Sequence, residues 1–188
     1  MAYHGNAKMA MAATAGVTHE HELEELRVGV SELAECVACL LHTILFTRAP
    51  GPVRPAEAHC RFRPITYAYC PVAEVTRKVD AAIAQFQRHM TRHHAGRGHR
   101  ITVVFFETRV NKALFGFVQN EEKVVWEKWT LPIRVLVHPS ANPDEYHMQL
   151  ESQLRHGMLQ IVSTVQTDTQ HIPLGIYDCE LLVNDDVL

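Results

Sequence analysis

Residues 124–138 constrain the fold of this chain most, because their side chains alternate in character over a length that suits a long strand. The odd positions from Val125 to Val137 are apolar with the single exception of Glu127. Strict alternation of this kind predicts a long β-strand with one buried face. Pro132 cannot donate a ladder hydrogen bond, so we expect a bulge there or a sheet edge on that side.

Three segments have the apolar spacing of helices. Residues 31–48 form the most regular one, and Ser31 stands at the expected N-cap. A second helix is predicted to open at Pro71, and a third to begin near Asp144. Further strands are expected at 26–30, 62–69, 101–106 and 176–183. This order of elements predicts an α+β fold, a mixed β-sheet backed by three α-helices.

The bulk properties favour one domain in a reducing compartment. The chain has 188 residues, which is long enough for one well-packed domain. Residues 1–21 show no sustained period, so we expect a disordered N-terminal arm over residues 1–22 and a single domain over 23–188. A net charge of −3 argues against a nucleic-acid partner, and five cysteines suit the cytoplasm better than a disulfide framework. No apolar run reaches the roughly 18 residues of a membrane span, so at most peripheral membrane contact is expected.

Two groups of residues invite a chemical interpretation. Cys36 and Cys39 form a C-x-x-C inside the first predicted helix, where buried core thiols are the alternative to a zinc or redox site. Several cationic or imidazole side chains cluster between the second helix and the following strand: Arg88, His89, Arg92, His93, His94, Arg97, His99 and Arg100. They are expected to be solvated, with phosphate or metal contact as alternatives. No catalytic motif occurs, so we predict no catalytic residues, no metal and no cofactor.

The connector at 113–118, Ala-Leu-Phe-Gly-Phe-Val, is apolar although it joins two predicted strands. Either the strands extend further than predicted, or the loop covers the core, or it is a hydrophobic tip that inserts into a partner.

Several motifs, in order, resemble the autophagy-related protein 101 family, closest to its plant-like members. They are Leu-His-Thr-Ile-Leu-Phe-Thr-Arg at 41–48 with the proline-rich 50–55, Ile-Thr-Tyr at 65–67, Phe-Phe-Glu at 105–107, Trp-Glu-Lys-Trp at 126–129 and His-Ile-Pro at 171–173. The resemblance runs from about Leu23 to the end. It implies a HORMA fold without catalytic activity. It also implies a heterodimer with the HORMA domain of autophagy-related protein 13, within the kinase complex that initiates autophagy at the preautophagosomal structure.

The family also carries a Trp-Phe finger that recruits downstream autophagy factors. By resemblance, the finger maps to Leu114, Phe115 and Gly116, with Leu114 in place of tryptophan and Phe117 next to it.

Two other functions stay open. One is a peptide-closing HORMA adaptor of the checkpoint or polymerase-associated type. The segment of about twenty residues after the third helix argues against it, because it is long enough for only one strand and its connection. The other is a metal-dependent or redox enzyme that uses Cys36, Cys39 and the histidine-rich loop.

Overall fold

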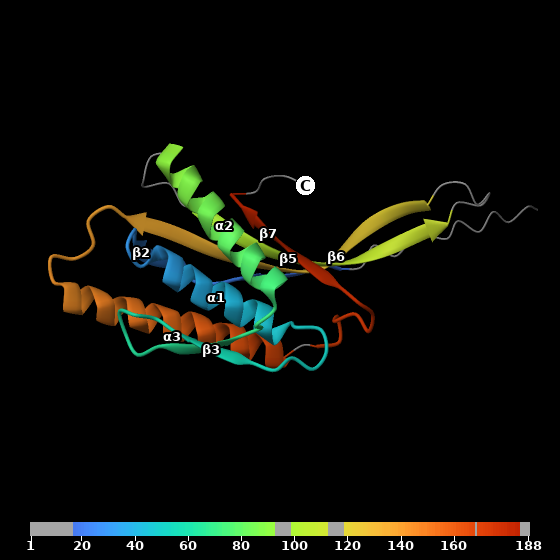
Figure 1. Cartoon of the computed structure of the whole chain (residues 1–188), viewed down its shortest axis with the longest axis horizontal. Coiled ribbons are helices and arrows are strands. Elements are labelled where there is room, and N and C mark those ends of the chain that lie inside the picture. The colour runs from blue at the N-terminus through green and yellow to red at the C-terminus, as the bar shows by residue number, and fades with distance from the viewer. Residues whose placement is uncertain (1–16, 93–98, 113–118, 168, 185–188) are drawn as a thin grey trace, which may run out of the picture.

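The part of the chain that the structure describes folds into a five-stranded mixed sheet, a two-stranded hairpin and three helices (Figure 1). The computed structural model describes residues 17–92, 99–112, 119–167 and 169–184. The elements are β1 (His19–Glu22), β2 (Leu26–Gly29), α1 (Leu33–Thr47), β3 (Ala56–His59), β4 (Thr66–Tyr69), α2 (Ala73–Arg92), β5 (His99–Lys112), β6 (Gln119–Leu136), α3 (Pro143–Thr167) and β7 (Asp178–Val183). The predicted α+β class, with a mixed sheet and three helices, is confirmed.

The long strand β6 organises the sheet, whose order is β1-β6-β5-β7, with β2 also paired to β6. β5 runs antiparallel to β6, whereas β1 and β2 run parallel to it. The ladder on the β1 and β2 side of β6 is interrupted. The Leu23 N–H donates to the Thr130 carbonyl at 2.9 Å, and pairing resumes at Leu26, which lies opposite Ile133. Pro132 lies at the break because it has no N–H to offer on the side where Thr130 directs its carbonyl.

The bulge expected at Pro132 occurs elsewhere. Phe105 pairs with Glu127 but Phe106 pairs with Val125, so the extra residue of β6 is Trp126. A bulge of this kind changes which face the following side chains occupy. As a result, Trp126 and Glu127 are both buried although they are neighbours in sequence.

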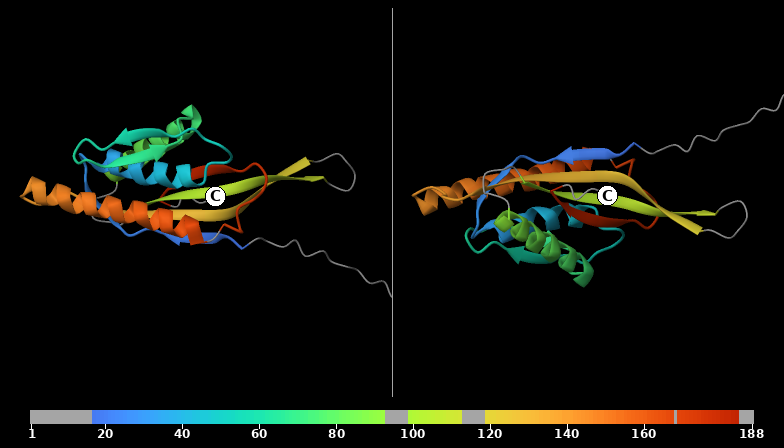
Figure 2. Two further views of the ribbon diagram at one scale, coloured as in Figure 1. Left: turned by 90° about the horizontal axis from the view of Figure 1, so that it is seen from below. Right: turned by 90° about the horizontal axis from the view of Figure 1, so that it is seen from above.

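The helices pack side by side, with α1 between α2 and α3 (Figure 2). Toward the sheet, α2 contacts β7 and α3 contacts β2, and the β3–β4 hairpin packs on α1. Gly157 allows α3 to approach α1 closely, because a Cβ there would lie 2.9 Å from the Cδ2 of Leu40. The hydrophobic core lies between these helices and the sheet.

Some element boundaries differ from the predictions. α1 begins at Leu33 with Glu32, not Ser31, at the N-cap. The reason is that the Ser31 hydroxyl bonds instead to the Glu32 carboxylate at 3.1 Å. His19–Glu22 form β1 although they were predicted to lie in the disordered arm, and β3 lies in a segment for which no strand was predicted. Among the described residues, no helix is long and apolar enough to cross a membrane.

Candidate interaction surfaces and the Glu127 cluster

The outer ends of β5 and β6 form a two-stranded arm, residues 107–112 and 119–124, that projects past the helices (Figure 1). At its base, Lys123 forms an ion pair with Glu180 of β7 and lies 4.6 Å from the ring centre of Phe106. The strands therefore extend further than predicted. The predicted finger residues lie between the two strands, outside the described residues: Leu114, Phe115, Gly116 and Phe117.

α3 presents large apolar side chains to solvent. The exposed fractions of Met148, Leu159 and Val162 are 56%, 68% and 39%. Leu159 and Val162 are three residues apart, so they lie on one face of the helix. Together with Ile65 next to β4 they line a shallow pocket of about 280 Å³. Exposed apolar side chains gathered around a recess are typical of a protein-binding surface.

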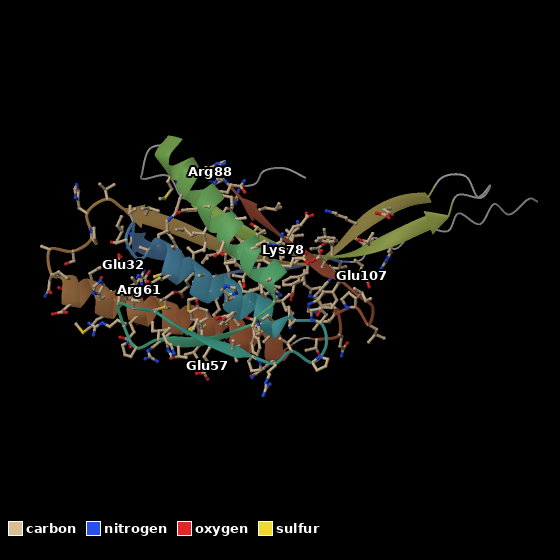
Figure 3. All side chains as sticks on the ribbon, viewed as in Figure 1. Glu32, Glu57, Arg61, Lys78, Arg88 and Glu107 are labelled. Carbon is tan, nitrogen blue, oxygen red and sulfur yellow. The ribbon has the colours of Figure 1, made fainter. Side chains whose placement is uncertain are left out.

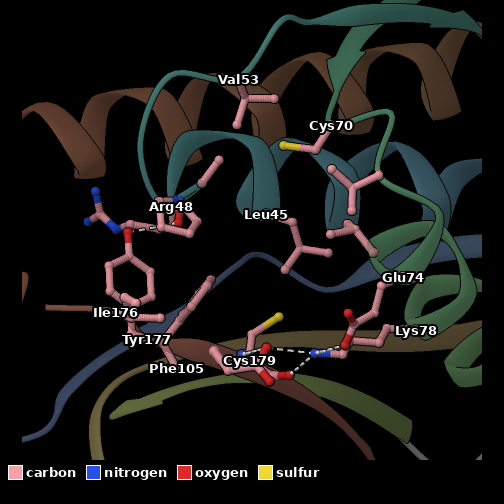
Figure 4. A pocket seen from close by; sticks show the side chains of 15 residues that line it. Leu45, Arg48, Val53, Cys70, Glu74, Lys78, Phe105, Ile176, Tyr177 and Cys179 are labelled. Carbon is pink, nitrogen blue, oxygen red and sulfur yellow. Dashed lines mark hydrogen bonds and ion pairs between the residues drawn. The ribbon is translucent and has the colours of Figure 1, made fainter.

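A second recess lies between the end of α1, the start of α2 and β7 (Figure 4). Its volume is about 370 Å³, and Leu45, Phe105 and Tyr177 are among its walls. On its α2 side, the Lys78 ammonium points to the start of β7 (Figures 3 and 4) and donates to Asp178 Oδ1 at 2.6 Å. This ion pair helps to hold α2 against β7.

A buried charged group joins four segments of the chain. Glu127 of β6 is 0% exposed, and Arg48 at the end of α1 donates to its Oε2 at 2.8 Å through Nε and to its Oε1 at 2.9 Å through Nη2. His21 Nε2 of β1 and His171 Nε2, ahead of β7, lie 3.2 Å and 3.0 Å from the same Oε1. The Tyr177 hydroxyl donates to the Arg48 carbonyl at 3.0 Å. We refer to Arg48, Glu127, His21 and His171 as the Glu127 cluster.

The charges of this cluster follow from its burial and its hydrogen bonds. Burial acts to raise the pKa of Glu127, but the hydrogen bonds and charge of Arg48 bring it below the ordinary value. Burial lowers the pKa of His21, although the Glu127 carboxylate acts in the opposite direction. At neutral pH the Glu127 carboxylate is therefore ionised and paired with Arg48, and the His21 imidazole is neutral.

Three donor atoms of the cluster have the spacing of metal ligands. His21 Nε2, His171 Nε2 and a carboxylate oxygen of Glu127 lie within 4.8 Å of one another. However, Arg48 already neutralises this carboxylate through two hydrogen bonds. A divalent cation at the same oxygen would be repelled by the guanidinium at close range in a buried setting. We therefore describe the cluster as a hydrogen-bonded ion pair and assign no metal ligands to it.

The cysteine pair is part of the core. Cys36 and Cys39 are both 0% exposed on α1, which confirms that they are buried thiols. Burial raises the pKa of Cys36, and a hydrogen bond with Cys60 together with burial raises that of Cys39. Protonated thiols are poor nucleophiles and poor zinc ligands. This argues against redox or zinc chemistry at the C-x-x-C.

The predicted basic loop is only partly described, because residues 93–98 lie outside the described ranges. Arg88 is exposed on α2 (Figure 3), whereas His99 is 8% exposed at the start of β5. The His99 ring meets Phe86 edge to face at 5.6 Å, so it belongs to the packed core and not to a solvated loop.

Sequence analysis did not single out the Glu127 cluster, although one signal was present. Glu127 is the only charged residue at the odd positions from Val125 to Val137, and a charge on an otherwise apolar face requires a buried partner. The partner positions depend on tertiary structure, because Arg48, His21 and His171 come from three other segments.

The sheet, the three helices and the exposed apolar recesses define an α+β domain with surfaces suited to protein contacts. A family model described as Autophagy-related protein 101 matches residues 25–176. A protein of that name from Arabidopsis thaliana is 28% identical in an alignment 172 residues long; the alignment covers 81% of this chain and 78% of the plant protein. The chain belongs to the autophagy-related protein 101 family, and a HORMA fold is consistent with that membership.

Proposed function

We propose that this protein is a non-catalytic HORMA adaptor of the autophagy-initiation kinase complex, and that it binds and stabilises the HORMA domain of autophagy-related protein 13 as a heterodimer. The observation that carries the proposal is the family match over residues 25–176 of a chain with the expected sheet and three helices. The buried, protonated thiols of α1 agree with a role that depends on protein surfaces.

The apolar face of α3 is the surface that we assign to the partner HORMA domain. Leu159 and Val162 are exposed there beside a recess that an apolar side chain of a partner can fill. Exposed apolar side chains that gather around a recess mark a surface that binds another protein.

The arm of β5 and β6 supports the second part of the proposal, recruitment of downstream autophagy factors. The arm, residues 107–112 and 119–124, projects past the helices, and residues 113–118 join its two strands in the sequence. The finger Leu114, Phe115, Gly116 and Phe117 is thereby proposed to contact partners away from the α3 surface, so both contacts can form at once.

The alternative, a peptide-closing adaptor, requires the C-terminal strand to leave its place. β7 pairs antiparallel with β5 from Ile101↔Val183 to Phe106↔Asp178. Lys78 adds contacts to Asp178 Oδ1 and, at 3.0 Å, to the Cys179 carbonyl. Release of β7 would break this ladder and the contacts between β7 and α2. We therefore favour an adaptor that binds its partner without changing its own shape.

The test is capture of the full chain on the immobilised HORMA domain of autophagy-related protein 13 from the same organism. Retention at micromolar concentration is the expected result. A chain that is folded by circular dichroism but is not retained would contradict the heterodimer.

A further inference from the structure

The recess between the end of α1, the start of α2 and β7 has apolar walls that reach the solvent (Figure 4). Its volume of about 370 Å³ lies within the range of about 300–1,000 Å³ that is typical of ligand sites. Val72 and Ile176 are 48% and 94% exposed, and the other apolar walls are Leu45, Val53, Val75 and Phe105. Exposed apolar side chains around a recess are typical of a surface that another protein covers.

The charged groups at the rim of the recess leave one negative charge over. The Lys78 ammonium contacts two carboxylates, Asp178 at 2.6 Å and Glu74 at 3.5 Å. The side chains of both carboxylates are mostly exposed, at 60% for Asp178 and 61% for Glu74. Arg48 also lines the recess, but Glu127 neutralises it through two hydrogen bonds. Among the lining residues that the structure describes, two carboxylates therefore face one ammonium, and a cation of an occupant would complement them.

The recess is separate from the α3 surface that we assign to the partner HORMA domain. Its walls come from α1, α2, β5, β7 and the segments next to them. α1 lies between α2 and α3 (Figure 2), so the recess and the α3 surface lie on different sides of α1. An occupant of the recess leaves Leu159 and Val162 accessible, and its binding does not depend on the heterodimer.

We propose that this recess binds a segment of another protein that inserts a bulky apolar side chain and carries a lysine or arginine beside it. The apolar side chain covers Val72 and Ile176, and the cation pairs with Glu74 or Asp178 at the rim. Burial of apolar surface supplies most of the affinity. The exposed ion pair contributes mainly to selectivity.

Selection of random dodecapeptides displayed on phage tests the proposal, with the immobilised full chain as bait. Dissolved Val72→Asp protein is present in excess, so that peptides which bind elsewhere are removed. Enriched peptides should carry a bulky apolar residue next to a lysine or arginine. The absence of enrichment, or enrichment of peptides without such a pair, would overturn the proposal.

Val72 suits this purpose because of its place at the start of α2. Its carbonyl accepts a hydrogen bond from the Thr76 N–H at 3.1 Å, so it stands where an aspartate favours a helix. Val72→Asp should therefore fold, and circular dichroism checks this. If it does not fold, Ile176→Asp takes its place, because Ile176 is 94% exposed and lies outside the helices and strands.

The most enriched peptide is then synthesised, and fluorescence polarisation measures its affinity. Val72→Asp should weaken binding at least about tenfold, because a charge replaces an apolar contact. Glu74→Lys should weaken it about three- to tenfold through repulsion of the peptide cation, and a peptide with glutamate in place of that cation should bind this variant better than it binds the wild type. Glu57→Lys, at an exposed position of β3 outside the recess, should bind as the wild type does.

Two results of these measurements would contradict the proposal. One is undiminished affinity in Val72→Asp, and the other is a charge reversal that neither weakens binding nor is rescued by the glutamate peptide. Light scattering of the full chain alone should give the mass of one copy. A dimer that Val72→Asp dissociates would assign the recess to a second copy of this chain and overturn the proposal.

Discussion

Glu127 is the buried counter-ion of Arg48. Arg48 is only 4% exposed, so Glu127→Gln leaves a guanidinium in the core without an anion. We expect this substitution to lower the free energy of unfolding by about 3–5 kcal/mol. Urea denaturation measures the loss.

The control is Glu121→Gln, at an exposed position of the same strand. It should change the free energy of unfolding by less than about 0.5 kcal/mol. Equal effects of the two substitutions would mean that the Arg48–Glu127 pair does not contribute to stability as described.

At the residue scale, the sequence indicates where a buried charge lies but not what pairs with it. Glu127 breaks the apolar alternation of its strand, and that irregularity can be read without a structure. The identity of its partners depends on which strand pairs with β6 and on where α1 ends. Those are tertiary facts, since His21 reaches Glu127 only through the parallel pairing of β1 with β6.

At the scale of elements, the outer face of α3 is expected to bind the partner. The double substitution Leu159→Asp and Val162→Asp places charge on exposed positions, so the chain should fold as before. Its affinity for the HORMA domain of autophagy-related protein 13 should fall at least about tenfold, because an apolar interface tolerates buried charge poorly. Isothermal titration calorimetry measures the affinity.

Ser152→Asp is the control for α3, because it adds a charge at another exposed position of the helix. Unchanged affinity is the expected result for it. Loss of affinity in the control, or full affinity in the double variant, would place the interface elsewhere.

The arm carries a separate prediction. Leu114→Ala with Phe115→Ala should leave both the unfolding midpoint and heterodimer formation unchanged while it weakens recruitment of downstream factors, since aromatic anchors dominate such contacts. Co-precipitation of those factors with the assembled complex measures recruitment, with Glu121→Ala as the exposed control. An unfolded double variant would instead mean that these residues belong to the core.

The long elements could be predicted because their periodicity extends over many residues, as in α1, α2, α3 and β6. The short strands β1 and β3 could not. β1 and β3 have four residues each, with polar side chains alternating at the surface, which is too short a pattern to separate from a loop. The bulge at Trp126 escaped prediction because it arises from the register between two strands.

At the scale of the whole molecule, acid should destabilise the fold. Burial lowers the pKa of His21 and of His42, so below their ordinary pKa of 6.5 the unfolded chain binds more protons than the folded chain. The free energy of unfolding should therefore fall from pH 7.5 to 5.5, by about 1 kcal/mol for each imidazole that stays neutral when folded. Below about pH 4.5 the lowered pKa of Glu127 adds to the loss.

Denaturation curves at the two pH values measure this dependence. His42→Gln should make it shallower, because it removes one buried imidazole of α1 from the balance. Stability that rises on acidification would contradict the burial and charge assignments of these histidines.

The central claim is that this chain acts through a heterodimer, and the direct measurement is the mass of the complex. The full chain and the HORMA domain of autophagy-related protein 13 from the same organism are co-expressed and separated by size-exclusion chromatography with light scattering. A single peak with the mass of a one-to-one complex is the result that we predict. Two separate peaks, each with the mass of a folded partner alone, would contradict the proposed function.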